Sequence, residues 1–188
     1  MKKTLITILC TVLVCSCVMG ATLALLTAKT DTVTNTFTIG NINIELKESR
    51  GTLVEGSQTN RTFKMVPGST IDKDPTITVM ANSEACWLFV KVDKSANFAD
   101  FMTYEMDESW TPLANNEGVY YQEVASNAAD QTFAVLNGNK VTVLDTVTKD
   151  QADALTTSKA YPTLSFTAYA VQKDNVADAA AAWAAVTP

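Results

Sequence analysis

The sequence of 188 residues contains no histidine, and this absence narrows the chemistry open to the chain. Histidine is the commonest general base in enzymes and the commonest ligand of zinc. A Ser-His-Asp triad, a Cys-His pair and an HExxH zinc site are therefore excluded. We expect the chain to be no enzyme, with no catalytic residues, no metal ligands and no cofactor.

Acidic residues occur in two close pairs, Asp72 with Asp74 and Asp107 with Glu108. In the absence of histidine, such carboxylates could hold a hard cation such as calcium, or act as a general acid and base. Acidic pairs on a solvated surface are far commoner than either kind of site. We therefore expect both pairs to be surface groups.

Three of the four cysteines, Cys10, Cys15 and Cys17, lie in the apolar N-terminal segment. Removal of that segment would leave Cys86 alone, so the remaining chain could form no internal disulfide. Cys86 begins an apolar stretch that reaches Val92. We expect a small buried side chain there, rather than a nucleophile or an intermolecular bridge.

The aromatic residues Trp87, Trp110, Tyr120 and Tyr121 suggest an alternative kind of site. Such side chains could form a platform for sugar rings, and the chain would then be a secreted binding module for a glycan or a surface protein. On strands they are more often core residues or cross-strand partners. We expect the structural role.

The N-terminus has the three parts of a secretory signal peptide. A positive start is followed by an uncharged apolar run and then by small residues. Thr22 and Ala24 are small residues at the positions three and one before a cut between Ala24 and Leu25. The sequence therefore predicts a signal peptide over 1–24 and a protein exported to the cell surface or the extracellular matrix.

Other fates of this segment are compatible with the sequence. A cut after Ala21 or Ala28 would place a larger residue, Met19 or Leu26, three positions back. The apolar run is also long enough to remain in a bilayer as a single anchor. A lipoprotein signal at Cys17 is a weaker alternative, because the preceding residues match the required pattern poorly. We expect cleavage, since no basic cluster follows the run.

The chain is acidic, with 14 basic and 20 acidic residues and a net charge of −6. Loss of Lys2 and Lys3 with the signal peptide would leave 12 basic against 20 acidic residues, a charge of −8. Phosphate backbones and anionic membrane surfaces repel such a chain. We expect no nucleic-acid partner.

Residues 25–41 are predicted to form an extended arm ahead of a domain over 42–188. The arm is rich in threonine, and from Val33 its apolar residues lie mostly at alternate positions, as in a strand. The domain pattern predicts about nine short strands with turn signals between them, typical of an antiparallel sandwich or barrel. The main expected strands are 42–46, 62–66, 76–80, 86–92, 119–124, 131–136, 140–147 and 162–171.

Several local features of the domain are also predicted. Asn137-Gly138-Asn139 indicates a hairpin turn between 131–136 and 140–147. A short helix or loop is expected over 95–106, and a helical turn over 149–155. An apolar stripe near the C-terminus predicts a terminal helix with Asn175 as its N-cap. Within 86–92, the core face is expected to hold Cys86, Leu88, Val90 and Val92, with Trp87, Phe89 and Lys91 opposite.

Four stretches, in their order, carry a resemblance to a known family. The exported start with 31–42 resembles the junction of Gram-positive proteins processed by a SipW-type signal peptidase. The stretch 65–75 looks like a turn and strand of the same family, and 164–174 with Ala182-Trp183 looks like its last strand and end. The chain thus resembles the TasA and camelysin family of secreted, fibre-forming matrix proteins.

This resemblance implies a jelly-roll-like β-sandwich with short helices, including a C-terminal helix. It also implies a structural subunit of biofilm matrix fibres, in which the arm of one subunit completes a sheet of the next. The partners would be other copies of the chain, a SipW-type signal peptidase and other matrix proteins. The arm residues expected in the assembly strand are Thr27, Thr30, Val33, Asn35, Phe37 and Ile39.

The metalloprotease activity once attached to camelysin finds no support in the residues, because the chain has no histidine. An arm that pairs within its own domain, or stays loose, remains an alternative to strand donation.

Overall fold

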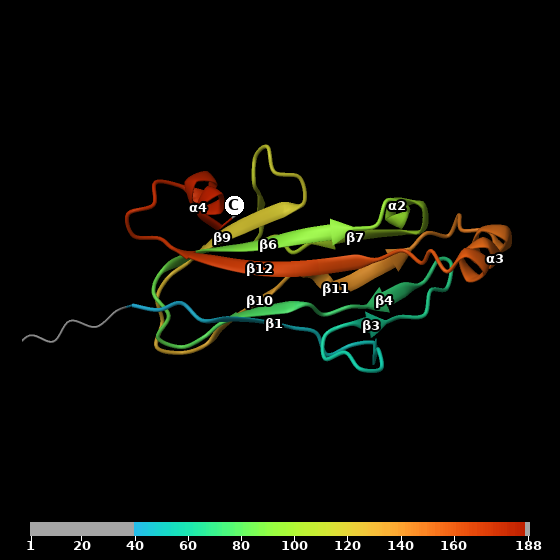
Figure 1. Cartoon of the computed structure of the whole chain (residues 1–188), viewed down its shortest axis with the longest axis horizontal. Coiled ribbons are helices and arrows are strands. Elements are labelled where there is room, and N and C mark those ends of the chain that lie inside the picture. The colour runs from blue at the N-terminus through green and yellow to red at the C-terminus, as the bar shows by residue number, and fades with distance from the viewer. Residues whose placement is uncertain (1–39, 187–188) are drawn as a thin grey trace, which may run out of the picture. The chain divides into compact units, whose positions relative to one another are not determined.

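Antiparallel strands carry most of the buried apolar side chains in residues 40–186, the part of the chain that this computed structural model describes (Figure 1). The predicted cleavage site, Ala24 and Leu25, lies outside the described residues. So do all the arm positions expected in the assembly strand, namely Thr27, Thr30, Val33, Asn35, Phe37 and Ile39. The described residues fall within one unit over 39–188.

The elements are mainly short strands. The strands are β1 (Ile44–Lys47), β2 (Thr52–Leu53), β3 (Arg61–Thr62), β4 (Thr70–Asp72), β5 (Thr76–Val79), β6 (Cys86–Lys94), β7 (Met102–Met106), β8 (Thr111–Pro112), β9 (Val119–Val124), β10 (Gln131–Ala134), β11 (Leu136–Val143) and β12 (Leu164–Gln172). The helices are α2 (Phe98–Phe101), α3 (Lys149–Ser158) and α4 (Ala179–Val186). A mostly β chain with short helices, one of them at the C-terminal end, is as the sequence predicts.

All the strand pairs are antiparallel. Three sheets form the body of the described unit, with the strand orders β1-β5-β10, β4-β11-β7 and β12-β6-β9-β8. The pair β2 and β3 stands apart as a small ribbon. The two longest strands, β6 and β12, pair over nine residues without a break in register.

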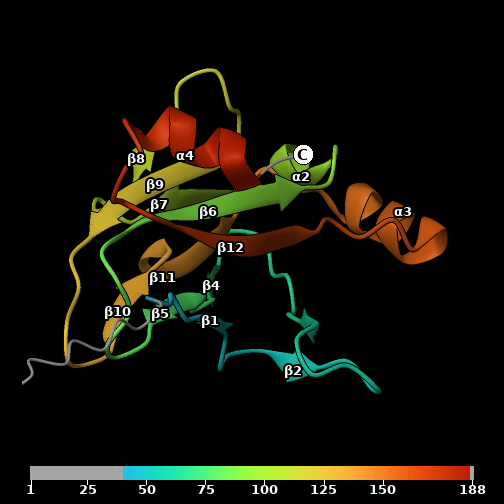
Figure 2. The ribbon, with the colours of Figure 1, turned by 60° about the vertical axis from the view of Figure 1, so that its left-hand side comes forward.

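Strand β6 is buried on both faces, which the alternating pattern did not predict. Its expected core face is confirmed, since Cys86, Leu88 and Val90 pack with Ile77 of β5 in one apolar cluster. The opposite face is also covered: Phe89 is fully buried in a second cluster together with Trp87. Figure 2 shows the reason, because α4 lies over this face of the sheet, while β1, β5 and β10 lie beneath the other.

Helix α4 is confirmed, but its N-cap differs from the prediction. Asn175 has a φ of 64°, which is left-handed rather than the extended conformation of an N-cap. The helix is capped by Asp178 instead, whose Oδ1 accepts a hydrogen bond from the amide of Ala181 at 2.8 Å. Trp183 then packs against the rings of Phe89 and Tyr169, with centroids 5.3 and 5.2 Å away.

The predicted hairpin at Asn137-Gly138-Asn139 is wrong. Strand β10 pairs with β5, whereas β11 pairs with β4 and β7, so the two strands lie in different sheets. The chain changes sheet at Val135, which is fully buried. Gly138 and Asn139 do have positive φ, 58° and 55°, but they form a bulge inside β11.

Two other expected elements differ in extent. Residues 95–106 form a four-residue helix, α2, followed directly by β7, rather than a helix or loop throughout. The expected strand 62–66 is reduced to β3, and the chain then turns at Gly68, where Ser69 donates its amide to Val66 O. Helix α3 is longer than the predicted turn and begins with a capping box between Thr148 and Gln151.

Within residues 40–186, none of the helices combines the length and the apolar character that a membrane span requires.

Candidate functional site: an open strand edge and the groove beside it

The longest edge strand of the three main sheets is β12. It is the last strand of its sheet and pairs only with β6, so among the described residues no strand is hydrogen-bonded to its outer edge. Its sequence, LSFTAYAVQ, has no charge, no proline and no glycine. Natural sheets usually protect an edge with lysine, proline, a bulge or a very short strand. Strand β12 has none of these devices over nine residues.

The other edges of the three main sheets are shorter, and most are protected. Strand β1 carries Glu45 and Lys47, β7 carries Glu105, and β8 ends in Pro112. Strands β4 and β10 have three and four residues. Because an unprotected edge is a template for further strand pairing, β12 offers the longest such template in the described unit.

The two faces of β12 differ in chemistry. Leu164, Phe166, Ala168 and Ala170 point toward the interior and are half-buried against the apolar clusters. At the start of the strand the opposite face is polar, and there Ser165 and Thr167 are exposed. A strand added at this edge would therefore have the apolar side chains of β12 next to one of its faces and the hydroxyl groups of Ser165 and Thr167 next to the other.

The chain enters the described unit at the end of β12 that is marked by Gln172. Asn41 accepts a hydrogen bond from the Glu84 amide at 3.0 Å, and Asn43 accepts one from the Met80 amide at 2.9 Å. The Asn43 amide in turn donates to Oγ of the buried Ser83 at 3.1 Å. The root of the N-terminal segment is thus fixed to the domain by its backbone.

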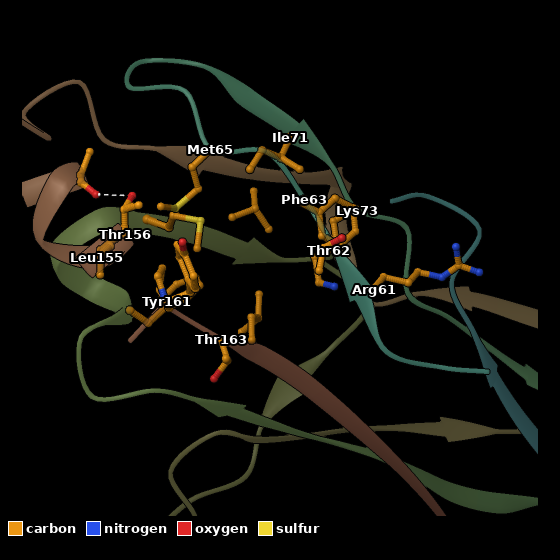
Figure 3. Close-up of a pocket in the computed structure, with 16 residues that line it drawn as sticks. Arg61, Thr62, Phe63, Met65, Ile71, Lys73, Leu155, Thr156, Tyr161 and Thr163 are labelled. Carbon is orange, nitrogen blue, oxygen red and sulfur yellow. Dashed lines mark hydrogen bonds between the residues drawn. The ribbon is translucent and has the colours of Figure 1, made fainter. Parts of the chain in front are cut away.

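An apolar groove of about 560 Å³ lies beside the first residue of β12 (Figure 3). Its walls come from the segment around β3 and β4, from α2, α3, β7 and β11, and from the chain just before β12. The apolar lining residues include Phe63, Met65, Ile71, Met102, Leu155 and Leu164. Arg61 directs its guanidinium away from the groove and donates to the carbonyls of Ser49 and Gly51.

A buried ion pair closes one end of this groove. Lys73 Nζ lies 2.9 and 3.0 Å from the two carboxylate oxygens of Glu48, and both side chains are at most 15% exposed. The same ammonium group stands 4.8 Å from the ring centre of Phe63 and 5.5 Å from that of Phe166. It therefore links the β3 segment to β12 through cation–π contacts.

The two acidic pairs do not form joint sites. Asp74 binds the backbone amides of Ser49 and Arg50 at 3.0 and 2.9 Å. Partial desolvation raises the pKa of Asp74, but the hydrogen bonds from Ser49 and Arg50 outweigh it and the net pKa is lowered. Asp107 accepts from the amide and hydroxyl of Ser109 within a turn. Asp74 and Asp107 therefore each hold a loop in place.

No three His, Cys, Asp or Glu side chains come together in a metal-binding cluster within residues 40–186. Cys86 is fully buried, and burial raises the pKa of its thiol to about 11. A neutral thiol of this kind is a poor nucleophile, so the expected structural role of Cys86 is confirmed.

The aromatic residues proposed for a sugar platform are not gathered on one surface. Trp110 is buried in the cluster beneath β6 and donates its Nε1 hydrogen to Ala134 O at 2.8 Å. Trp87 is buried in the cluster under α4, where it meets Tyr121 edge to face. These tryptophans thus lie on opposite faces of the sheet, and the expected structural role is confirmed for both.

Sequence reasoning missed the two features that define this region. The strand over 162–171 was predicted, but nothing local in its residues shows that it lies at an edge. Its lack of charge points the wrong way, because an uncharged strand is expected inside a sheet. The pairing of Glu48 with Lys73 had no signal, since 25 residues separate them.

Comparison with known proteins identifies no relative: no family model, no curated protein and no solved structure matches this chain.

Proposed function

We propose that the chain is an exported structural subunit of extracellular matrix fibres, which assembles when the N-terminal arm of one copy adds a strand to the sheet of the next. The observation that supports this proposal is the unprotected nine-residue edge of β12, in a chain whose sequence from Val33 to Ile39 has the alternating pattern of a strand. The function uses backbone hydrogen bonds and apolar contacts, and it requires no catalysis.

The proposal extends to the architecture and the processing of the chain. In this proposal the sheet β12-β6-β9-β8 and the sheet β1-β5-β10 beneath it belong to a jelly-roll-like β-sandwich, as the resemblance to the TasA and camelysin family implies. A SipW-type signal peptidase would cut between Ala24 and Leu25, and the product would act outside the cell in a biofilm matrix. Its partners are further copies of itself and other matrix proteins.

Deletion of residues 25–36 tests the proposal. The chain that starts at Leu25 should form filaments visible by electron microscopy, whereas the shortened chain should stay monomeric in sedimentation and keep the same β-rich circular dichroism spectrum. We expect the spectrum to persist because all the strands described over residues 40–186, β1 to β12, lie outside the deleted range. Filaments from the shortened chain would exclude the arm as the donor.

A control of unchanged length separates strand pairing from the mere presence of an arm. Replacement of Val33 and Phe37 by aspartate keeps the arm but puts charge where strand donation needs apolar side chains. This variant should also remain monomeric. A chain starting at Leu25 that stays monomeric at high concentration would contradict the whole proposal.

A further inference from the structure

We infer that the acceptor in this assembly is the outer edge of β12, and that the arm of a second copy pairs with it in the antiparallel direction. The inference rests on the proposed function and adds the location and the orientation of the joint. Two features of the described unit support it, the unprotected edge and the position of Gly40, and the sequence pattern of the arm suits the faces of β12.

The arm is long enough to pair with the whole of β12 in a neighbouring copy. Strand β12 has nine residues, or roughly 30 Å at the usual rise of a strand. The arm over 25–39 has 15 residues and can span about 50 Å when extended. The arm can therefore leave its own domain, cross a short gap and still cover the whole of β12 in a neighbour.

The arm has faces that suit those of β12. In an added strand, Thr32, Thr34, Thr36 and Thr38 would share one side, next to Ser165 and Thr167. Val33, Phe37 and Ile39 would lie on the other side with the half-buried Phe166. Neighbouring Thr–Ser or Thr–Thr pairs and apolar pairs across strands both stabilise a sheet.

The direction follows from where the chain enters the domain. A side chain placed on Gly40 would meet Glu84 Cγ at 2.8 Å, and Glu84 lies two residues before Cys86, the partner of Gln172 in the sheet. The described chain therefore starts at the Gln172 end of β12, as Figure 1 shows. An arm running outward from this end points away from its own Leu164.

A second copy shifted along the strand axis in the same orientation meets this arm in the antiparallel sense. The arm residues near Ile39 then lie at the Leu164 end of the neighbour's β12. An arm that folds back onto its own domain has the opposite sense, because it would run parallel to β12 and bring Thr32 near Ser165. When each copy is shifted in the same way from the one before, the head-to-tail contacts do not close into a ring. The assembly therefore grows as a fibre.

Disulfide trapping distinguishes these two arrangements in the chain that starts at Leu25. Ser165→Cys is combined with Thr38→Cys or Thr36→Cys, which covers the two closest registers on the same face. Cross-strand neighbours lie within disulfide reach, so oxidation should give a ladder of covalent oligomers on a non-reducing gel. The native Cys86 is buried and should not take part.

The matched control combines Ser165→Cys with Thr32→Cys. In the antiparallel joint these positions lie roughly 20 Å apart, so this pair should give at least tenfold less covalent oligomer. A covalent monomer from Ser165→Cys with Thr32→Cys would show the arm folded back on its own β12 and would overturn the inference.

Failure of the inference and failure of the proposed function give different results. If filaments form but neither of the two main pairs cross-links between chains, strand donation stands and the acceptor is not β12. If no variant and no unmodified chain forms filaments, the proposed function itself is wrong, and the inference falls with it.

Discussion

At the scale of single residues, Lys73 and Glu48 form the least exposed ion pair of the described unit. The two groups neutralise each other where both are largely removed from water. Loss of one partner would leave the other charge buried and unpaired, which costs far more than loss of an exposed pair. The pair also holds the β3 segment against Phe166 of β12.

Glu48→Gln should therefore lower the free energy of unfolding by about 2 kcal/mol, measured by urea denaturation of the chain that starts at Leu25. The matched control is Glu45→Gln, because Glu45 pairs with Lys47 at 2.8 Å but both side chains are exposed. That change should alter stability by no more than about 0.5 kcal/mol. Equal effects of the two changes would contradict the structural role of the buried pair.

At the scale of elements, helix α4 determines how the sheet is buried. It covers Trp87 and Phe89, so the face of β6 that it meets belongs to the core. The cap at Asp178 sets where this helix begins, since it satisfies the amide of Ala181, one of the amides left free in the first helical turn.

Replacement of Asp178 by alanine should lower the free energy of unfolding by about 1 kcal/mol, because the cap is lost. Asp178→Asn is the control, since asparagine caps a helix about as well and should leave stability nearly unchanged. Urea denaturation followed by tryptophan fluorescence measures both, because Trp183 reports on the packing of the helix. If Asp178→Ala were silent, a different residue would have to cap the helix.

The elements also show where sequence reasoning succeeds and where it fails. Strands β1, β5, β6, β9 and β12 were predicted because their patterns are local and strong. The Asn137-Gly138-Asn139 signal was correct about positive φ but wrong about the hairpin, since a turn and a bulge need the same backbone conformation. Only distant partners, β4 and β7, decide between them.

Burial of the second face of β6 was equally beyond local reasoning. The side chains of Trp87 and Phe89 are covered by a helix that begins almost a hundred residues later. For the candidate site, the sequence predicted the arm and the strand over 162–171. The sequence could not show which strand lies at the edge of the sheet. A strand lies at an edge when no other strand pairs with its outer side, and this depends on the pairing of all the other strands.

At the scale of the whole molecule, charge governs how readily the subunits meet. The chain that starts at Leu25 carries a net charge of −8, so its copies repel one another. The proposed joint is nevertheless nearly neutral, because β12 has no charged side chain and the segment over 25–39 has one lysine and one aspartate.

Filament growth should therefore accelerate with salt. Between about 10 and 150 mM salt the Debye length falls from roughly 30 to 8 Å, which screens the repulsion but not the backbone pairing. Light scattering should show growth at least several-fold faster at the higher concentration. Growth that slows with salt would point to ionic contacts as the driving force. The chain lacking 25–36 is the control, and its light scattering should not increase with time at either salt concentration.

The attachment of Asn41 and Asn43 to the 80–84 segment has a mechanical consequence for such a fibre. Tension along the fibre axis would enter each domain at Gly40 and run parallel to β1. The hydrogen bonds of Asn41, of Asn43 and of the four β1–β5 register pairs would then be sheared together rather than peeled one at a time. A load shared in this way makes the link between arm and domain resist pulling.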